Sequence, residues 1–249
     1  MTLLAAVHAE WTKVATVRSL PMALLAYAVV VFGVSTGVVT GIGAGEAATP
    51  GYDAAVLAFY GLNFGHVAVV VFAVLLTAGE YSRHTVHPSL VAVPRRGRFL
   101  AAKVGVGTAL VLAVAVPTAL GTLAGTQALL GSAAVDLGTP GVVRATLAAA
   151  LYPTLFGAFC MGVGMLLRDQ VAALGVLIPF FFLVTPVLEL IPVLRTAAQF
   201  LPDRAGQVAV RLHGRPVDEF GPVTGLAVLA LWALAAVLVA WWGLRRRDA

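Results

Sequence analysis

The sequence predicts an all-α membrane protein with six transmembrane helices, and three observations point to this class. The chain has 249 residues, of which 60% are hydrophobic and only 11% are charged. Its mean hydropathy is +0.97. A chain with this small share of polar side chains cannot form a surface that is exposed to water, and lipid must therefore cover most of the molecule. Six apolar stretches are each long enough to cross a bilayer, which takes about 20 helical residues.

The six stretches share an almost continuous apolar character, and they span residues 20–39, 56–78, 101–126, 142–167, 171–192 and 222–243. Inside a bilayer the backbone must satisfy its own hydrogen bonds, so a spanning segment is either a helix or a strand of a closed barrel. The stretches lack the alternation of barrel strands. We therefore expect residues 1–249 to form a single transmembrane domain built from helices.

The basic residues predict the orientation of this domain. With both termini in the cytoplasm, eleven of the 16 Lys and Arg residues fall on the cytoplasmic side, as the positive-inside rule requires. Four of the other five lie in the long outer segment 193–221, where the rule gives charge little weight. We expect a multi-pass protein of the plasma membrane whose net charge of +5 meets anionic lipid. Nucleic acid is not an expected partner, because no basic face is interleaved with aromatic residues.

Residues 1–19 are expected to form an interfacial helix that lies flat on the inner leaflet. Its apolar residues recur at helical spacing, at Leu4, Val7, Trp11 and Val14, whereas His8, Glu10 and Lys13 point to other sides. An indole ring such as that of Trp11 is typical of the headgroup level of a membrane.

In the first span, Gly33, Gly37 and Gly41 recur at every fourth position, and Gly45 continues the series. A stripe of small residues lets another helix approach closely. We expect helix packing along this stripe, either within the chain or, as the less common alternative, between subunits.

Polar residues inside the spans are the candidate substrate path, because charge at membrane depth is costly. Asn63 and His66 share one face of the second helix, and Glu189 lies near the outer end of the fifth. The alternatives are an interhelical hydrogen bond for Asn63 and His66 and exposure at the membrane surface for Glu189. The fifth span also contains Pro179, Pro186 and Pro192, which either kink it into a hinge or are simply tolerated.

Two polar segments are expected outside the membrane. Residues 79–98 are too polar to insert, so we expect a cytoplasmic loop containing a short helix parallel to the membrane. Residues 193–221 form an outer excursion, in which we expect short helices because structureless loops of this length are uncommon.

The sequence contains no recognisable catalytic or metal site. ATP hydrolysis of the phosphate-loop type needs a glycine-rich loop ending in Lys-Ser or Lys-Thr, but Lys13 and Lys103 are each followed by valine. His84 and His87 form an isolated pair with no third ligand nearby, and a Gly-x-Ser-x-Gly elbow is absent. We expect a protein that is not an enzyme and holds no cofactor.

Four segments of the chain resemble a known family, the membrane subunits of ABC transporters of the type-2 exporter class. They are similar to the short six-helix permeases of high-GC Gram-positive bacteria. The segments are HAEWTKVATVRS, TAGEYSRHTVHPSLVAVPRRGRFLAAK, FLPDRAGQVAV and LRRRDA. The second segment is the most specific of the four, although His84 stands where members of the family often have glycine.

The resemblance implies a permease that dimerises with a second copy or a paralogue and docks on a separate cytoplasmic ATPase subunit, which binds ATP and magnesium. It places a coupling helix between the second and third spans, and the matching residues are Glu80, Tyr81, Arg83, Thr85, Arg95 and Arg96. It also brings the second and fifth spans to the substrate path, which adds Phe181 to Asn63, His66 and Glu189. The alternative for the loop is a set of positive charges without a partner protein.

The expected function is the export of a hydrophobic or amphipathic substrate, such as a drug, a peptide antibiotic or a lipid. A membrane sensor or scaffold that does not transport is the first alternative. An ion-driven carrier is the second, for which more intramembrane carboxylates and an inverted repeat would be expected.

Overall fold

The computed structural model describes residues 2–47, 49, 51–82, 96–131, 134–136, 138–214 and 218–246. Over these residues the structure is all-helical, without strands. Six helices are long and apolar enough to cross a membrane: Ser19–Gly43, Leu62–Tyr81, Arg96–Leu130, Val142–Leu167, Gln170–Leu190 and Pro222–Arg246. The predicted fold class is confirmed.

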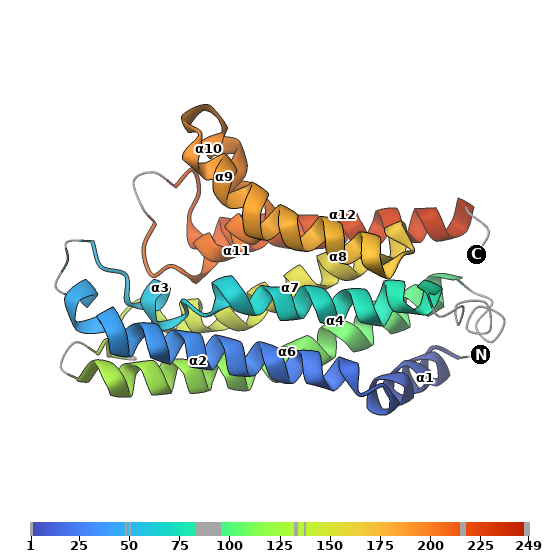
Figure 1. Ribbon diagram of the computed structural model, residues 1–249, viewed down its shortest axis with the longest axis horizontal. Coiled ribbons are helices and arrows are strands. Elements are labelled where there is room, and N and C mark those ends of the chain that lie inside the picture. Colours follow the sequence, from blue (N-terminus) through green and yellow to red (C-terminus); the bar gives the residue numbers. More distant parts are fainter. Residues whose placement is uncertain are drawn as a thin grey trace.

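The long helices lie side by side along the longest axis of the molecule, and both termini are at the same end (Figure 1). We call this the terminal end and the opposite one the distal end. The end of α4 (Leu62–Ser82) and the start of α6 (Arg96–Leu130) lie at the terminal end, next to α1 (Leu3–Thr16). The first span, α2 (Ser19–Ala47), runs from there to the distal end.

The second apolar stretch does not form one continuous helix as predicted. Its first residues belong to the short helix α3 (Ala54–Ala58), which Asp53 caps by accepting hydrogen bonds from the amides of Ala55 and Val56. A turn follows, and α4 begins only at Leu62. The Gly61 amide donates to Ser35 Oγ at 3.0 Å. A Cβ at Gly61 would lie 2.2 Å from the Val31 carbonyl oxygen, so this close crossing over α2 requires glycine and interrupts the helix.

The segment 79–98 also differs from the prediction of a polar loop. Helix α4 continues through Glu80 and Tyr81 to Ser82, and α6 begins at Arg96. The predicted coupling helix falls mainly on residues 83–95, which lie outside the described part of the chain.

The fifth span is irregular in the region of its prolines. It consists of α8 (Gln170–Pro179), a π-helical turn (Phe180–Val184) and α9 (Thr185–Leu190). Pro186 lacks an N–H and its ring collides with the carbonyl four residues earlier, which favours a wider turn there. Ile191 is extended before Pro192, as residues before proline prefer.

At the distal end the chain forms two short helices, α10 (Pro192–Gln199) and α11 (Pro202–Val210), before the last span, α12 (Pro222–Arg246). Helices α9 and α10 rise away from the bundle, whereas α11 lies against α7 (Val142–Leu167) and α12 (Figure 1).

Helix α7 is the central element of the bundle and packs against α4, α6, α11 and α12. Its large buried side chains include Tyr152, Phe156 and Met161. Helix α12 crosses at Gly162, where an added Cβ would lie 2.7 Å from the backbone carbon of Ala236.

Candidate functional site

A buried cluster of four charges joins three helices at the terminal end. It consists of Glu10 and Lys13 on α1, Glu80 on α4 and Lys103 on α6, and we call it the four-charge cluster. Lys103 Nζ lies 2.7 Å from Glu10 Oε2 and 2.7 Å from Glu80 Oε1. Lys13 Nζ lies 2.8 Å from Glu10 Oε1 and 2.8 Å from Glu80 Oε1.

Three of the four charges are shielded from solvent, and the two positive charges balance the two negative ones. Lys103 is 0% exposed, and Glu10 and Glu80 are also buried. Lys103 donates a further hydrogen bond to the Leu76 carbonyl at 3.3 Å and lies over the ring of Phe99. A buried charge is tolerated when it is paired and hydrogen-bonded, and two lysines facing two glutamates meet this condition.

Lys13 is the most exposed member, with 35% of its side chain accessible. Burial by itself lowers the pKa of this ammonium group, but its hydrogen bonds to Glu10 and Glu80 outweigh burial and raise the pKa above its ordinary value. Lys13 therefore remains positively charged and holds the two carboxylates together from the solvent side.

Sequence reasoning placed Glu10 and Glu80 differently. Helical spacing predicts that Glu10 turns away from the apolar side of the first helix, and the polarity of residues 79–98 predicts a position in a cytoplasmic loop for Glu80. In the structure both carboxylates point into the bundle, whereas Leu4 and Trp11 are 82% and 54% exposed. The signal available in the sequence was the scarcity of lysine, because both lysines of the chain belong to the cluster. Pairing across three helices is a tertiary property that helical spacing alone does not reveal.

Two of the other predicted coupling residues, Tyr81 at the end of α4 and Arg96 at the start of α6, are described at the same end of the bundle. The ring of Tyr81 contacts the Arg168 guanidinium, 5.4 Å from the ring centroid. Arg96 donates a hydrogen bond to the Leu244 carbonyl near the end of α12. Arg83, Thr85 and Arg95 lie outside the described residues.

The four residues predicted for a substrate path are in different surroundings. Asn63 lines a cavity near the distal end. His66 is 5% exposed and packs between the rings of Phe156 and Phe182. Phe181 is buried against Phe156, with ring centroids 4.9 Å apart, so it belongs to the hydrophobic core. Glu189 forms an ion pair with Arg204 at 3.1 Å.

A further buried acid at the distal end was not identified from the sequence. Asp203 is 0% exposed at the start of α11, and Arg204 Nε lies 3.4 Å from its Oδ2. Burial raises the pKa of this carboxyl to about 7, although Arg204 acts in the opposite direction. In the sequence the residue reads as an ordinary first-turn acid of a helix.

The glycine stripe of α2 faces away from the other described helices. A Cβ added at Gly33, Gly37 or Gly41 would meet nothing within 4 Å among the described residues. The more common alternative, packing of this stripe within the chain, is therefore wrong for the described part of the structure.

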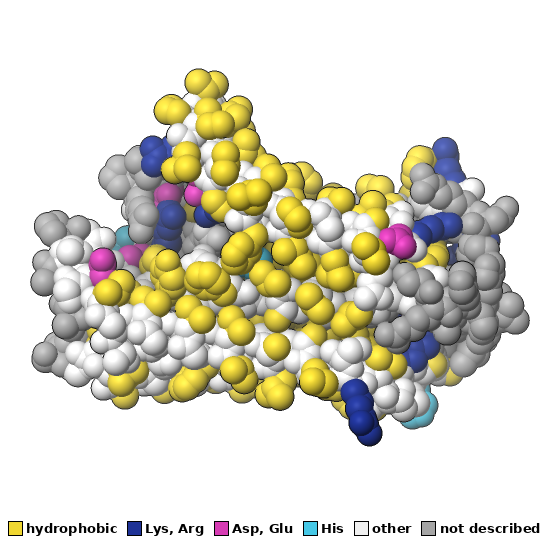
Figure 2. Space-filling view, in the orientation of Figure 1, with side chains coloured by type: hydrophobic (Ala, Val, Ile, Leu, Met, Phe, Trp, Pro, Cys, Tyr) yellow, Lys and Arg dark blue, Asp and Glu magenta, His cyan; other side chains and the backbone are white. Residues whose placement is uncertain are grey.

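The helices and their surface define a multi-pass, all-α membrane protein. Large apolar side chains such as Met22, Leu25 and Val29 are exposed on α2. Figure 2 shows hydrophobic side chains over the middle of the molecule, whereas charged side chains gather toward its two ends. This is the pattern expected of a chain with lipid around its centre.

Comparison with known proteins does not assign the chain to a family. No protein-family model matches the chain, and no curated protein matches its sequence. The resemblance to type-2 exporter permeases therefore rests on the four segments quoted above.

Proposed function

We propose that this protein is the permease subunit of an ATP-driven exporter, which moves a hydrophobic or amphipathic substrate with energy from a separate cytoplasmic ATPase. The proposal combines the resemblance of the four segments with the six-helix fold. In this proposal the terminal end faces the cytoplasm, and residues 83–95 contact the ATPase.

The four-charge cluster is the observation that carries the proposal. Glu80 lies near the end of α4, just before residues 83–95, and Lys103 lies in the first part of α6, which follows them. Glu10 and Lys13 join α1 to both helices. Lys103 bridges Glu80 on α4 and Glu10 on α1. A push on the intervening segment would reach three helices as one unit, because buried ion pairs resist separation of their partners.

The cluster gives Glu80 a role that differs from the one its position in the resemblance implied. A buried carboxylate paired with two lysines presents little charge to a partner protein. Glu80 instead holds the base of the coupling segment, and contact with the ATPase is left to residues further along that segment.

A permease of this kind works as a dimer, and the glycine stripe of α2 supports a subunit interface. Gly33, Gly37 and Gly41 are open to the outside of the bundle. Small residues at this spacing permit close contact between membrane helices, so we assign the stripe to contact with a second copy or a paralogue.

Reconstitution with an ATPase tests the proposal. A candidate phosphate-loop ATPase would be co-expressed with this chain, and both would be purified together and placed in lipid vesicles. We expect co-purification, and we expect ATP hydrolysis that rises when dodecanamide or another amphipathic compound is added. An assembled complex that hydrolyses ATP but moves none of a panel of labelled amphipathic compounds would favour a sensor or scaffold. Transport by this chain alone, driven by an ion gradient, would refute the proposal.

The double variant Glu80→Gln with Lys103→Met distinguishes coupling from assembly. It removes one charge of each sign, so the remaining pair Glu10 and Lys13 still balances. We expect the complex to assemble and to bind ATP, with transport per ATP hydrolysed reduced several-fold. Arg195→Gln on α10 is a matched control at the distal end, for which we expect unchanged coupling.

A further inference from the structure

A groove of about 520 Å³ lies at the distal end, between the last turns of α2 and the short helix α3. We call it the distal groove. Small-molecule sites typically measure roughly 300–1,000 Å³ and combine apolar walls with a few polar groups, so the groove has room for a drug-sized ligand. It is separate from the four-charge cluster, which lies at the terminal end.

The apolar wall of the distal groove is formed by Val38 and Ile42 on α2 and by Leu57 on α3. Leu57 belongs to a small hydrophobic cluster against which Val38 packs, and this contact holds α2 and α3 together along the wall. Ile42 is 55% exposed, so the wall continues to the apolar outer surface of α2. An apolar molecule in the groove is therefore covered on one side and is reached from the lipid.

Two carboxylates make the distal groove negative, Glu46 at the end of α2 and Asp53 before α3. Glu46 is exposed, and its carboxylate forms no ion pair with a described residue. The Asp53 carboxylate accepts hydrogen bonds from the backbone amides of Ala55, Val56, Leu212 and His213. These neutral donors fix its position but do not cancel its charge. The sequence has no Lys or Arg between residues 19 and 82, and the described lining of the groove contains none.

The ring of Tyr60 is the third feature of the distal groove. It is 39% exposed and packs against Phe64, with ring centroids 6.2 Å apart. The face of an aromatic ring attracts a cation that lies within about 6 Å of its centroid. A cleft lined by charges of one sign also concentrates ligands of the opposite sign. The ring and the carboxylates therefore both favour a cation and disfavour an anion.

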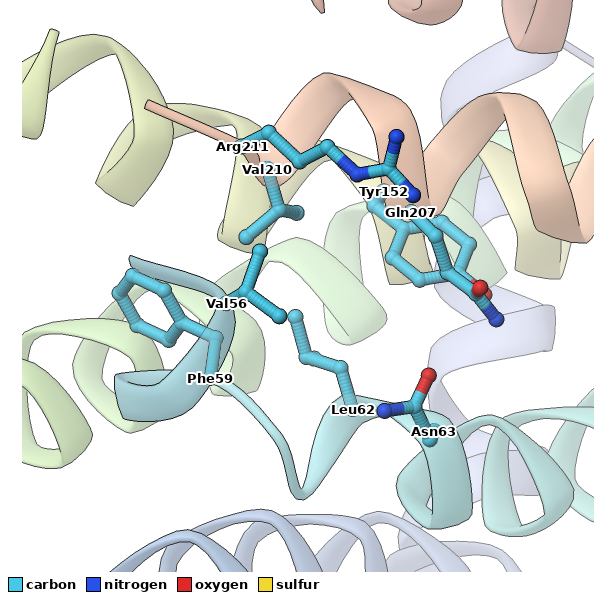
Figure 3. Close-up of a pocket in the computed structure, with 8 residues that line it drawn as sticks. All are labelled: Val56, Phe59, Leu62, Asn63, Tyr152, Gln207, Val210 and Arg211. Carbon is cyan, nitrogen blue, oxygen red and sulfur yellow. The ribbon is translucent and has the colours of Figure 1, made fainter. Parts of the chain in front are cut away.

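The neighbouring cavity offers different chemistry. It measures about 130 Å³ and shares Val56 with the distal groove. Figure 3 shows Arg211 on its wall, reaching toward Tyr152 and Gln207. None of the described residues that line it is acidic, so a cation would meet a guanidinium there without a carboxylate in the lining. Of the two sites, only the distal groove matches a positively charged ligand.

From these observations we propose that the distal groove binds an amphipathic ammonium compound, that is, a protonated or quaternary amine attached to an apolar body. Glu46 pairs with the ammonium group, the face of Tyr60 lies against it, and Asp53 adds attraction from the end of the groove. Val38, Ile42 and Leu57 cover the apolar body. The proposal concerns binding by this chain without an ATPase, so it can fail while the export proposal stands.

Photo-crosslinking of the full chain in phosphatidylcholine discs tests the proposal. The probe is dodecyltrimethylammonium with a diazirine at its third carbon, and labelled peptides are identified by mass spectrometry. We expect saturable labelling within residues 38–60. A choline headgroup carries a phosphate beside its ammonium group, which the two carboxylates repel, so the excess of lipid headgroups should not abolish labelling.

Competitors of equal chain length separate charge recognition from partition into lipid. Dodecyltrimethylammonium and dodecylamine should compete with the probe, whereas 1-dodecanol and dodecanesulfonate should not. Added salt should weaken labelling, because it screens exposed charges. Equal competition by all four compounds would show partition into lipid only, and absence of saturable labelling would show that no site exists. Either result overturns the proposal.

The variant Glu46→Gln removes the charge and keeps the shape of the side chain. Because Glu46 is exposed, the unfolding temperature should not change. The apparent affinity for dodecyltrimethylammonium should fall about fivefold, the upper range for one exposed charge pair. Asp136→Asn, at an exposed acid between α6 and α7 that does not line the groove, is the matched control and should leave affinity unchanged. Equal affinity in wild type and Glu46→Gln would contradict the proposed site.

A second pair of variants tests the aromatic contact. Tyr60→Leu should weaken binding several-fold, because it removes the ring face, whereas Tyr60→Phe keeps the ring and should bind like the wild type. Both variants are compared at equal amounts of folded protein. Equal loss in the two variants would mean that the hydroxyl and not the ring is recognised, which would contradict the proposed contact.

Discussion

The ammonium group of Lys103 on α6 lies 2.7 Å from the carboxylate of Glu80 on α4, inside the protein. These residues stand on either side of the segment 83–95, so the two helices that flank it are joined at its base. Since Glu10 binds the same ammonium group, α1 is part of the junction. This arrangement fixes the relative positions of α1, α4 and α6 at the terminal end of the bundle.

Loss of Lys103 should destabilise the fold. Lys103→Met leaves two buried carboxylates with Lys13 as their remaining cation in the four-charge cluster, and breaking a buried pair in this way costs about 3–5 kcal/mol. Lys13→Met, at the more exposed position, should cost no more than about 1 kcal/mol. Thermal unfolding of both variants in the same lipid or detergent measures the difference. Equal effects would mean that the cluster is more hydrated than its burial indicates.

The charges of the cluster should be energetically coupled. The double variant Glu10→Gln with Lys103→Met should lose less stability than the sum of the two single variants, by about 0.5–3 kcal/mol. The reason is that each single change leaves an unbalanced buried charge, which the second change removes. A double-mutant cycle from unfolding free energies measures this coupling, and strict additivity would show that the two residues do not interact.

Substitution on the glycine stripe should affect association without affecting the fold of one chain. A Cβ added at Gly37 meets no described neighbour within 4 Å, so the unfolding temperature of the Gly37→Leu monomer should change little. The dissociation constant of the dimer in lipid should rise by about tenfold or more, because one close helix contact is lost.

The contrasting variant is Gly162→Leu, because a Cβ there meets the backbone of Ala236. It should lower the yield of folded protein, whatever the state of association. Energy transfer between labelled chains in vesicles reports the dimer, and an unchanged dissociation constant for Gly37→Leu would place the interface elsewhere.

Asp203 should make stability depend on pH. Its folded pKa of about 7 lies above the ordinary value of 3.8, so between these values the folded state holds a proton that the unfolded state has released. Stability from this group is therefore fully present below about pH 4 and is lost as the pH rises toward 7. The unfolding temperature of the wild type should fall by several degrees more than that of Asp203→Asn between about pH 5 and 8. Parallel curves for the two proteins would show that Asp203 does not titrate in this range.

The sequence alone determined the class of this protein and the approximate position of every span. Hydropathy is a local property, and a stretch of about 20 apolar residues has one low-energy structure in lipid. The span predicted at 142–167 coincides with α7. The prediction of one continuous helix over residues 56–78 was wrong at Gly61. The apolar pattern continues through this residue, but its close contact with α2 interrupts the helix.

The tertiary structure decided which polar residues act together. Glu10, Glu80 and Lys103 are far apart in the sequence, and each taken alone resembles a solvated charge. They are buried because three helices place opposite charges within 3 Å of one another. Asn63, Tyr152 and Gln207 likewise share one cavity through the packing of α4, α7 and α11. Local patterns indicate where a chain enters the membrane, but the free energy of a buried polar group depends on its partners, and the fold supplies those partners.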